Sequence, residues 1–467
     1  MTPPAFSDAA GEAAWRSAVA KVLKGEDFDT RLLSRTLDGI PIQPLYPAAD
    51  APGPAGPRPP CRIVARLDAD EAAALGEIEN GADGLVLVFA GAPTARGFGL
   101  DLAGLDAALV GVELDLLPLR LEPAPFGGLD AVRALLEVAD ARRIPASSLD
   151  LDAGIDPIGF MARTGAAPQP WPRLGALTAE AVDVLRGRGL AGPLLHADGR
   201  PYHEAGASEA QELAAVVATG LAYLRALDTA GVSLDDARET LSFLLAADSD
   251  QFLTTAKFRA LRRLWARIEA DCSLAAAPIR LHAETSWRMM ARRDPPTNLL
   301  RGALACAGAM MSDADSVTVL PHTAALGLAD PFARRLARNT ALVLRDEAGL
   351  TRVVDPGAGS GAVETLTEAL CSEAWDLIRS LEGQGGLPAA LADGSWAARL
   401  AVTQGRRAAD LMGGTRTILG TTAFPLAEEP ALTVLKPLPA VPVPAAGALP
   451  SLRDDQLVEA PMPSGRA

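Results

Sequence analysis

Between residues 61 and 344, short runs rich in leucine, valine and isoleucine alternate with longer segments that have helical spacing. The strand-like runs are RIVARL (62–67), GLVLVF (84–89), VELDLL (112–117), ASSLDLD (146–152), GPLLHAD (192–198), IRLHAE (279–284) and SVTVLP (316–321). Helical segments of about 10–20 residues between such runs predict βαβ units in a parallel sheet. Roughly eight strands, with no GxGxxG turn in the first unit, favour an α/β fold of the closed (β/α)8 TIM-type barrel over an open sheet.

Two regions that flank the alternating segments have a different sequence pattern. Residues 1–60 predict a short N-terminal helix (AAWRSAVAKVL) and an extended arm over 27–60, because its prolines prevent helix. Residues 61–424 then form the barrel, and the stretch 363–411 continues as helix. Residues 425–467 are rich in proline and lack a core-building pattern, so we expect this tail to wrap a partner or to be extended or disordered.

Composition and charge exclude several classes of protein. The formal net charge of −15 argues against a nucleic-acid surface and against a polybasic membrane patch. The start of the chain lacks a signal-peptide pattern, and no apolar run approaches the roughly 18 residues of a membrane span, which predicts a soluble, cytoplasmic protein. The four cysteines lie far apart without a CxxC or Cys/His cluster, so we expect free thiols and no metal site.

Several histidines fall where a barrel carries its chemistry, at the carboxyl ends of strands. The predicted strand ends offer His196 with Asp198, His282 with Glu284, and His322. A histidine at a strand end is more often a hydrogen-bonded structural group than a catalyst. Position alone therefore names no active site.

Longer segments of the chain resemble the methylmalonyl-CoA mutase family, acyl-CoA mutases that use adenosylcobalamin. The segments are DGIPIQPLY (38–46), YHEAGASEAQELA (202–214), LSFLLAADSDQFLTTAKFRALRRLWA (241–266), RLHAETSW (280–287), FARRLARNTALVLRDEAGLTRVVDPGAGSGAVETLT (332–367) and GGTRTILGTTAFP (413–425). The resemblance implies a barrel that encloses the CoA thioester, followed in catalytic chains by a cobalamin-binding domain with a DxHxxG motif. No DxHxxG occurs here and only the proline-rich tail follows Phe424, so we expect a shortened form that binds no cobalamin itself.

The resemblance also points to altered substrate contacts. Catalytic members carry tyrosines near an Arg-Pro-Trp sequence after the arm, whereas no tyrosine follows Arg58-Pro59 here. Thr240 stands where an arginine, two residues before Ser242, holds a CoA phosphate, and a hydroxyl cannot replace a guanidinium there.

Three further positions complete the comparison. Glu284 replaces the family's glutamine, and the segment that should hold the adenosyl ribose has no carboxylate before Asp330. Arg163 matches an arginine that pairs with the substrate carboxylate. We interpret Arg163, Ser242, His282 and Glu284 as substrate-binding remnants.

His203 is the candidate for the family's acidic group. In catalytic members the corresponding histidine is separated from Glu-Ala-Gly by about two extra residues and hydrogen-bonds the thioester carbonyl. Here His203 directly precedes Glu204, so the loop is shorter and the ring is either displaced or held differently. Because a displacement of about 1 Å can remove much of such catalysis, we predict that His203 is a remnant.

Together these features are similar to the small (beta) subunit of a heterodimeric mutase. The resemblance then implies a non-catalytic chain that supports a large (alpha) subunit, with adenosylcobalamin bound by that partner and no cofactor or metal on this chain. The arm at 27–60 would be an interface element, although it could equally pack on its own barrel.

Two alternatives remain open. The first is an active acyl-CoA mutase chain that uses a separate cobalamin-binding subunit, which explains the missing domain but not the altered first shell. The second is an unrelated barrel aldolase or lyase, which needs a lysine or metal ligands at strand ends. None of the four lysines (Lys21, Lys24, Lys257, Lys436) is at a predicted strand end. The run GAGSG (357–361) lacks GK[ST] and predicts a tight turn, not a nucleotide loop.

Overall fold

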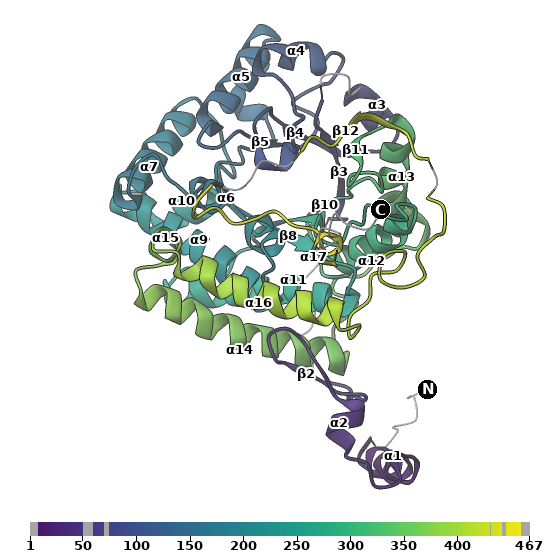
Figure 1. Ribbon diagram of the computed structural model, residues 1–467. Coiled ribbons are helices and arrows are strands. Elements are labelled where there is room, and N and C mark those ends of the chain that lie inside the picture. The colour runs from purple at the N-terminus through teal and green to yellow at the C-terminus, as the bar shows by residue number, and fades with distance from the viewer. Residues whose placement is uncertain (1–7, 50–58, 70–73, 430, 441–444, 459–467) are drawn as a thin grey trace, which may run out of the picture.

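Eight parallel strands form the centre of the computed structural model, which describes residues 8–49, 59–69, 74–429, 431–440 and 445–458. The strands are β3 Arg62–Leu67, β4 Gly84–Val88, β5 Leu119–Glu122, β6 Leu151–Asp152, β7 Leu195–Asp198, β8 Leu241–Ala247, β9 Arg280–Thr285 and β10 Ser316–Thr318. Each strand except β6 pairs with the next along the chain, and β10 pairs back to β3. Between β6 and β7 the connection is an isolated parallel bridge from Ile155 to Leu195. The ring is therefore closed, and the predicted TIM-type barrel is confirmed (Figure 1).

Helices surround this ring. They are α3 Ala74–Glu79, α4 Leu105–Ala108, α5 Gly128–Ala141, α6 Pro157–Thr164, α7 Trp171–Gly187, α8 Arg200–Glu204, α9 Glu209–Thr229, α10 Leu234–Glu239, α11 Gln251–Asp271, α12 Thr297–Met311 and α13 Pro331–Leu342. The stretch predicted to continue as helix after the barrel is divided into α14 Gly361–Gly383, α15 Leu387–Ala392 and α16 Ser395–Met412. Among the described residues, no helix is both long and apolar enough to cross a membrane.

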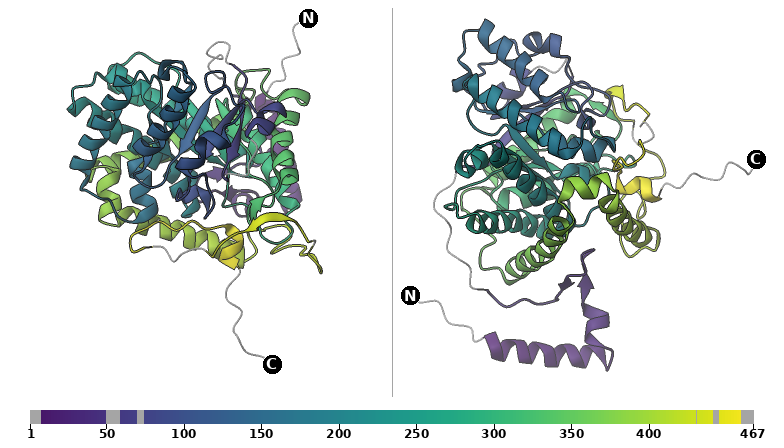
Figure 2. Two further views of the ribbon diagram at one scale, coloured as in Figure 1. Left: turned by 90° about the horizontal axis from the view of Figure 1, so that it is seen from above. Right: turned by 90° about the vertical axis from the view of Figure 1, so that its left-hand side faces the viewer.

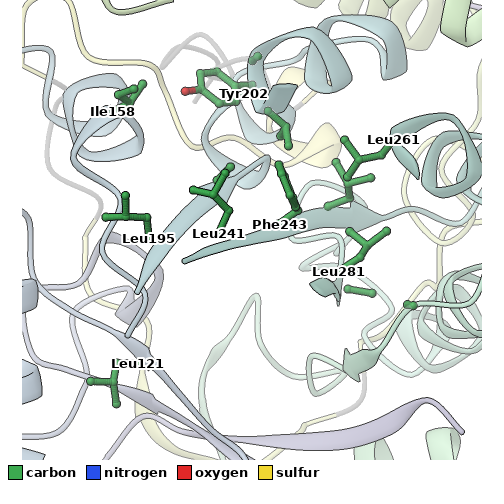
Figure 3. Packing of buried hydrophobic residues seen from close by; sticks show 14 of the residues in the cluster. Leu121, Ile158, Leu195, Tyr202, Leu241, Phe243, Leu261 and Leu281 are labelled. Carbon is green, nitrogen blue, oxygen red and sulfur yellow. The ribbon is translucent and has the colours of Figure 1, made fainter. Parts of the chain in front are cut away.

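Successive side chains along a strand point alternately outward and into the barrel. In β5, Leu119 and Leu121 point outward into the main hydrophobic core, whereas Arg120 and Glu122 point into the barrel, opposite Val86 and Val88 of β4. Outside the ring, Figure 3 shows apolar side chains such as Phe243 gathered between the strands and their helices. The interior, by contrast, carries many charged groups.

Most residues of helix α9 are buried. Its N-terminus is fixed by a capping box in which Ser208 and Gln211 satisfy each other's backbone N–H groups. The preceding Gly206 has φ +96°, and a Cβ there would approach within 2.6 Å of Gln404. The small-residue elbow after His203 is therefore required by close packing against α16.

The strand prediction failed at two places. The run 112–117 is not a strand, because Val112 and Leu114 bury their side chains from a turn-rich loop and β5 begins only after Pro118. A loop that packs on the core produces the same alternating pattern as a strand. The fully buried β8 was absent from the predicted runs, since its continuous apolar sequence has no alternation.

The N-terminal arm reaches away from the barrel. Helix α1 Asp8–Leu23 stands off the body beside the short helix α2 Phe28–Leu32, which interrupts the extended arm that we predicted (Figures 1 and 2). A hairpin of β1 Ser34–Arg35 and β2 Pro41–Ile42 follows. At its turn, Asp38 accepts hydrogen bonds from Ser208 Oγ and Ala210 N, which attaches the arm to the start of α9.

The described part of the C-terminal tail lies on the chain's own barrel and is largely extended, apart from one short helix. Strand β12 Val434–Pro437 pairs with β11 Gly327–Ala329, and the short helix α17 Asp454–Val458 follows. Asp454 and Asp455 are buried. In Figure 1 the yellow tail returns across the barrel opening toward α17.

Two predictions of local structure are confirmed. GAGSG forms a turn before α14, and all four cysteines are free thiols. Arg58 lies outside the described residues. No group of metal-binding side chains occurs in the part of the chain that the structure describes.

Candidate functional site

His203 is enclosed at the C-terminal end of the barrel, on α8 directly after β7. Its side chain is 1% exposed. The ring Nδ1 lies 2.8 Å from Glu212 Oε2, and Nε2 lies 2.9 Å from Ser286 Oγ and 3.3 Å from Asp248 Oδ2. Both ring nitrogens are therefore engaged by the protein itself.

The two carboxylates around His203 have cations of their own. Lys257 Nζ lies 2.7 Å from Glu212 Oε2, and Arg288 Nη2 lies 2.9 Å from Asp248 Oδ2. Burial raises the pKa of Glu212, but Lys257 and then His203 outweigh burial and lower it to about 2. The charges around His203 are therefore balanced within the chain, while Arg288 Nε has no hydrogen-bond partner among the described residues.

The neighbouring Glu204 connects the barrel to the tail. Its carboxylate accepts hydrogen bonds from Arg163 at 2.7 Å, from Arg96 at 3.2 Å and from the Ser451 hydroxyl. Its backbone carbonyl accepts from Leu452 N at 3.1 Å. Arg163, the predicted carboxylate-binding arginine, is thus paired with a carboxylate of the same chain.

Further tail contacts cover the same opening. Leu449 N donates to Ala162 O and Asp454 N donates to Arg288 O, both at 2.8 Å. These partners lie on loops and helices that follow β6 and β9. The tail therefore crosses the C-terminal mouth of the barrel.

Four side chains from opposite walls meet on the barrel axis, and we call them the cross-barrel cluster: Arg66, Glu122, Arg200 and Glu284. Arg200 Nη1 lies 2.8 Å from Glu122 Oε1 and 3.0 Å from Glu284 Oε2. Arg66 Nη1 lies 3.1 Å from Glu122 Oε2 and 2.9 Å from Glu284 Oε2. Burial opposes ionisation of Glu122, but Arg200 and Arg66 hold its pKa well below the usual range. The cluster therefore places four ion pairs across the interior of the barrel.

Beneath the cluster, toward the N-terminal end, lies a layer of hydrogen bonds among histidine, serine and aspartate side chains. His196 Nδ1 lies 2.7 Å from Ser242 Oγ. His282 Nδ1 lies 2.6 Å from Ser316 Oγ, and its Nε2 lies 3.1 Å from Asp152 Oδ2. Burial lowers the pKa of His282 to about 4, so the ring is neutral at pH 7.

Space inside the barrel is unequally distributed. At the C-terminal side, a cavity of about 40 Å³ lies beside Glu122, Arg163 and Arg200. At the N-terminal side, a cavity of about 310 Å³ lies beside Arg62, Arg120 and His282. The first volume suits one or two waters, whereas the second reaches the lower end of ligand-pocket sizes.

The structure brings the predicted site residues into one barrel but into separate layers. His203 and Arg163 lie at the C-terminal mouth, Glu284 lies in the cross-barrel cluster, and Ser242 and His282 lie below it. Two other positions serve local structure. Thr240 Oγ1 donates to Ala237 O, and Asp330 caps α13.

Sequence reasoning missed most of the ion-pair partners. Arg66, Glu122 and Arg120 interrupt otherwise apolar buried strands, and that was the available signal. A charged residue inside a buried strand needs a partner, so these positions predict a polar interior. Lys257 was placed correctly on a helix, but its long side chain reaches Ala246 O at the end of β8.

Comparisons with known proteins agree with this architecture. The model of the methylmalonyl-CoA mutase family matches residues 129–455. The small subunit of methylmalonyl-CoA mutase from Streptomyces virginiae is 41% identical over 97% of this chain and 76% of its own length. The small subunit from Propionibacterium freudenreichii subsp. shermanii is 35% identical over 95% of this chain and 73% of its own length.

A large-subunit sequence is related over a shorter region. The methylmalonyl-CoA mutase large subunit from Propionibacterium freudenreichii subsp. shermanii is 33% identical over 50% of this chain and 33% of its own length. The small-subunit matches span nearly the whole chain at 35–41% identity. The chain belongs to the methylmalonyl-CoA mutase family.

Proposed function

We propose that this chain is the non-catalytic small subunit of a heterodimeric, adenosylcobalamin-dependent methylmalonyl-CoA mutase. In this proposal a large subunit in the cytoplasm binds the cobalamin and interconverts methylmalonyl-CoA and succinyl-CoA. This chain stabilises that subunit. The observation that carries the proposal is the cross-barrel cluster.

The cluster occupies the axis along which a barrel of this family encloses its thioester. Arg66, Arg200, Glu122 and Glu284 are each no more than 8% exposed at the side chain. To admit an acyl chain, the protein would have to separate four buried ion pairs and leave charges unpaired, which costs several kcal/mol. The adjoining space of about 40 Å³ is too small for a thioester.

The C-terminal mouth is equally unsuited to a corrin ring. The tail residues Ser451 and Asp454 are bonded across it to Glu204 and Arg288. A large planar cofactor would have to displace these contacts together with the Arg163–Glu204 ion pair. The described residues therefore do not fit adenosylcobalamin, which supports its assignment to the partner.

The surroundings of His203 support its interpretation as a remnant. A catalytic acid must lie within hydrogen-bond reach of the substrate oxygen. In His203, Nδ1 instead contacts Glu212, and Nε2 contacts Ser286 and Asp248. Its role is then structural.

The N-terminal arm supports the proposed association with a large subunit. Helix α1 carries Trp15, Val19 and Val22, and Val22 is 77% exposed. The arm is held at Asp38 while α1 stands away from the barrel (Figure 2). An exposed apolar face on a projecting helix is suited to cover a second subunit.

The experiment combines this chain with the large subunit from the same cell. We expect this chain alone to show no adenosylcobalamin-dependent conversion of methylmalonyl-CoA, and the mixture to elute as a stoichiometric, active complex. A Val22→Asp variant should fold normally, by its unfolding temperature, and lose co-elution. Ser17→Asp, at an exposed position on the opposite side of the same helix, should retain it.

The same assay distinguishes the active-chain alternative. If this chain turns over when supplied only with a separate cobalamin-binding subunit, the proposal is wrong. Independent elution of the two chains at all concentrations would equally remove the partner role.

A further inference from the structure

The turn between β1 and β2 holds the N-terminal arm on the barrel. Asp38 lies in this turn, and Ile40, two residues later, is buried in the main hydrophobic core. The cation of the hairpin is used within it, because Arg35 Nη1 donates to Gly39 O at 2.9 Å. Helices α1 and α2 project from this point away from the barrel (Figure 2).

The Asp38 carboxylate bonds to residues on both sides of Glu209. It accepts hydrogen bonds from Ser208 Oγ and, at 3.2 Å, from Ala210 N. Glu209 stands between these two residues and is the first residue of α9. The first amides of a helix have no acceptor within the helix, so Asp38 serves as the acceptor for Ala210 N. Two carboxylates therefore meet at the start of α9.

The cations around this junction serve Glu209. Arg288 Nη2 lies 3.9 Å from Glu209 Oε1, and the charge of Glu209 also acts on Arg407 of α16. Helix α14 contributes a further acid, Glu373, whose charge acts on Asp38. Among the described residues, no lysine or arginine forms an ion pair with Asp38. The charged groups that face Asp38 from α9 and α14 are thus both acidic.

This surrounding favours the neutral form of Asp38. Burial and then the charge of Glu209 raise its pKa to about 7, although the hydrogen bonds from Ser208 and Ala210 oppose the rise. The ordinary value is 3.8, so the attached turn binds a proton that the detached turn gives up. The equilibrium constant for attachment is therefore largest below pH 3.8, falls about tenfold per pH unit up to about pH 7, and is nearly constant above it.

We propose that the Asp38 contact is a proton-operated latch, which holds the arm on the start of α9 while the carboxyl group is neutral and loosens it when the group ionises. The neutral carboxyl donates to Ser208 Oγ while its other oxygen accepts from Ala210 N. Ionisation keeps both contacts but adds repulsion from Glu209. The latch belongs to this chain alone, so it goes beyond the proposed subunit role and does not depend on it.

The test measures hydrogen exchange at the Ala210 amide of the full chain at pH 6 and pH 8. Each rate is compared with the intrinsic rate at the same pH, which gives a protection factor. In the wild type we expect this factor to fall about tenfold from pH 6 to pH 8, because Asp38 loses its proton over this range. Asp38→Asn imitates the neutral carboxyl group and should keep the same protection factor at both pH values.

A second measurement follows the ionisation of Asp38 itself. The chemical shift of its carboxyl carbon, identified by its loss in Asp38→Asn, should change with a midpoint at about pH 7. The matched control is Asp29→Asn, at an exposed aspartate on α2. It should show the same fall in protection at Ala210 as the wild type.

Three results would overturn the proposal. One is a protection factor at Ala210 that is the same at pH 6 and pH 8 in the wild type. Another is a fall in protection that Asp38→Asn retains. The last is an Asp38 carboxyl carbon that titrates at the ordinary value of 3.8 in the folded chain, which would mean that the junction does not hold a proton at neutral pH.

Discussion

The two ends of the barrel use the same kind of side chain in opposite ways. At the C-terminal end, His203, Glu212, Asp248 and Lys257 are buried and every charge has a partner at close distance. At the N-terminal end, Arg120 is equally buried and has donors without partners. The first end has almost no internal space, whereas the second has a cavity of about 310 Å³.

This difference shows how a barrel of an enzyme family can lose its substrate path while it keeps its fold. The closed end is filled by ion pairs and by the tail, both from the same chain. The outward-facing core of leucine and alanine is independent of these interior charges. Packing outside the ring therefore preserves the architecture, and the interior is free to change.

The largest expected effect comes from removing an ion-pair partner at the C-terminal end of the barrel. Lys257→Met removes the ammonium that lies 2.7 Å from Glu212 Oε2, in a site where both side chains are no more than 1% exposed. We expect a loss of about 3–5 kcal/mol in the free energy of unfolding, because an unpaired buried charge is left behind. Urea denaturation measures it. Arg267→Met, at an exposed pair, should cost less than about 0.5 kcal/mol.

A loss for Lys257→Met no larger than that of the Arg267→Met control would contradict the view that the closed end is held by its charges. The variant should also be checked for an unchanged far-ultraviolet circular dichroism spectrum. An unfolded variant at all urea concentrations would mean a larger cost in the same direction.

The ends should also differ in their response to pH. The pKa of His282 falls from about 6.5 when unfolded to about 4 in the native barrel. The unfolded chain therefore binds the extra proton first, and the stability from His282 is complete above pH 6.5 and lost as the pH falls to about 4. Glu212, with a pKa of about 2, contributes stability that is lost only below about pH 4.5.

The measurement is the difference in unfolding free energy between wild type and His282→Gln across this pH range. It should shrink by up to about 3 kcal/mol from pH 6.5 to 4, since one pKa unit corresponds to about 1.4 kcal/mol. Asp156 and Asp38, whose burial raises their pKa values to about 6 and about 7, titrate in the opposite sense and cancel in the difference. A difference that is constant with pH would exclude His282 as the titrating group.

A smaller effect is expected at the tail. Ser451→Ala removes one hydrogen bond to the ionised Glu204, which Arg163 and Arg96 still neutralise. We expect a loss of about 1–2 kcal/mol, and faster amide hydrogen exchange at Leu452 with little change in the barrel strands. Ser395→Ala, at the start of α16, serves as the control. Unchanged exchange at Leu452 would show that the tail is held by other contacts.

The barrel itself could be predicted from sequence because it depends on repeated local patterns. The segment between IRLHAE and SVTVLP, for example, has helical spacing and contains α12. The strand β5 was misplaced because Val112 and Leu114 mimic strand alternation from a loop. The contacts of the tail could not be predicted, because its buried Asp454 and Asp455 have no apolar pattern and depend on partners far away in sequence.

The candidate site was predictable residue by residue but not as an arrangement. The family resemblance pointed to His203, Arg163 and Glu284, which lie at the C-terminal mouth or, for Glu284, in the barrel interior. What fills the axis could not be foreseen, because Arg66 and Glu284 are separated by 218 residues in the chain. Pairing between side chains on strands that are not neighbours is a property of the closed ring, which no local pattern contains.

The most direct test of the central claim is the turnover of the assembled complex when this chain carries a substitution at its closed end. His203→Gln and Arg163→Gln are introduced into this chain, and co-elution with the large subunit is verified for each. The account predicts that the rate of methylmalonyl-CoA conversion per complex equals that of wild type. A tenfold or larger fall in rate at unchanged stoichiometry would show that this barrel takes part in the chemistry, and would contradict the account.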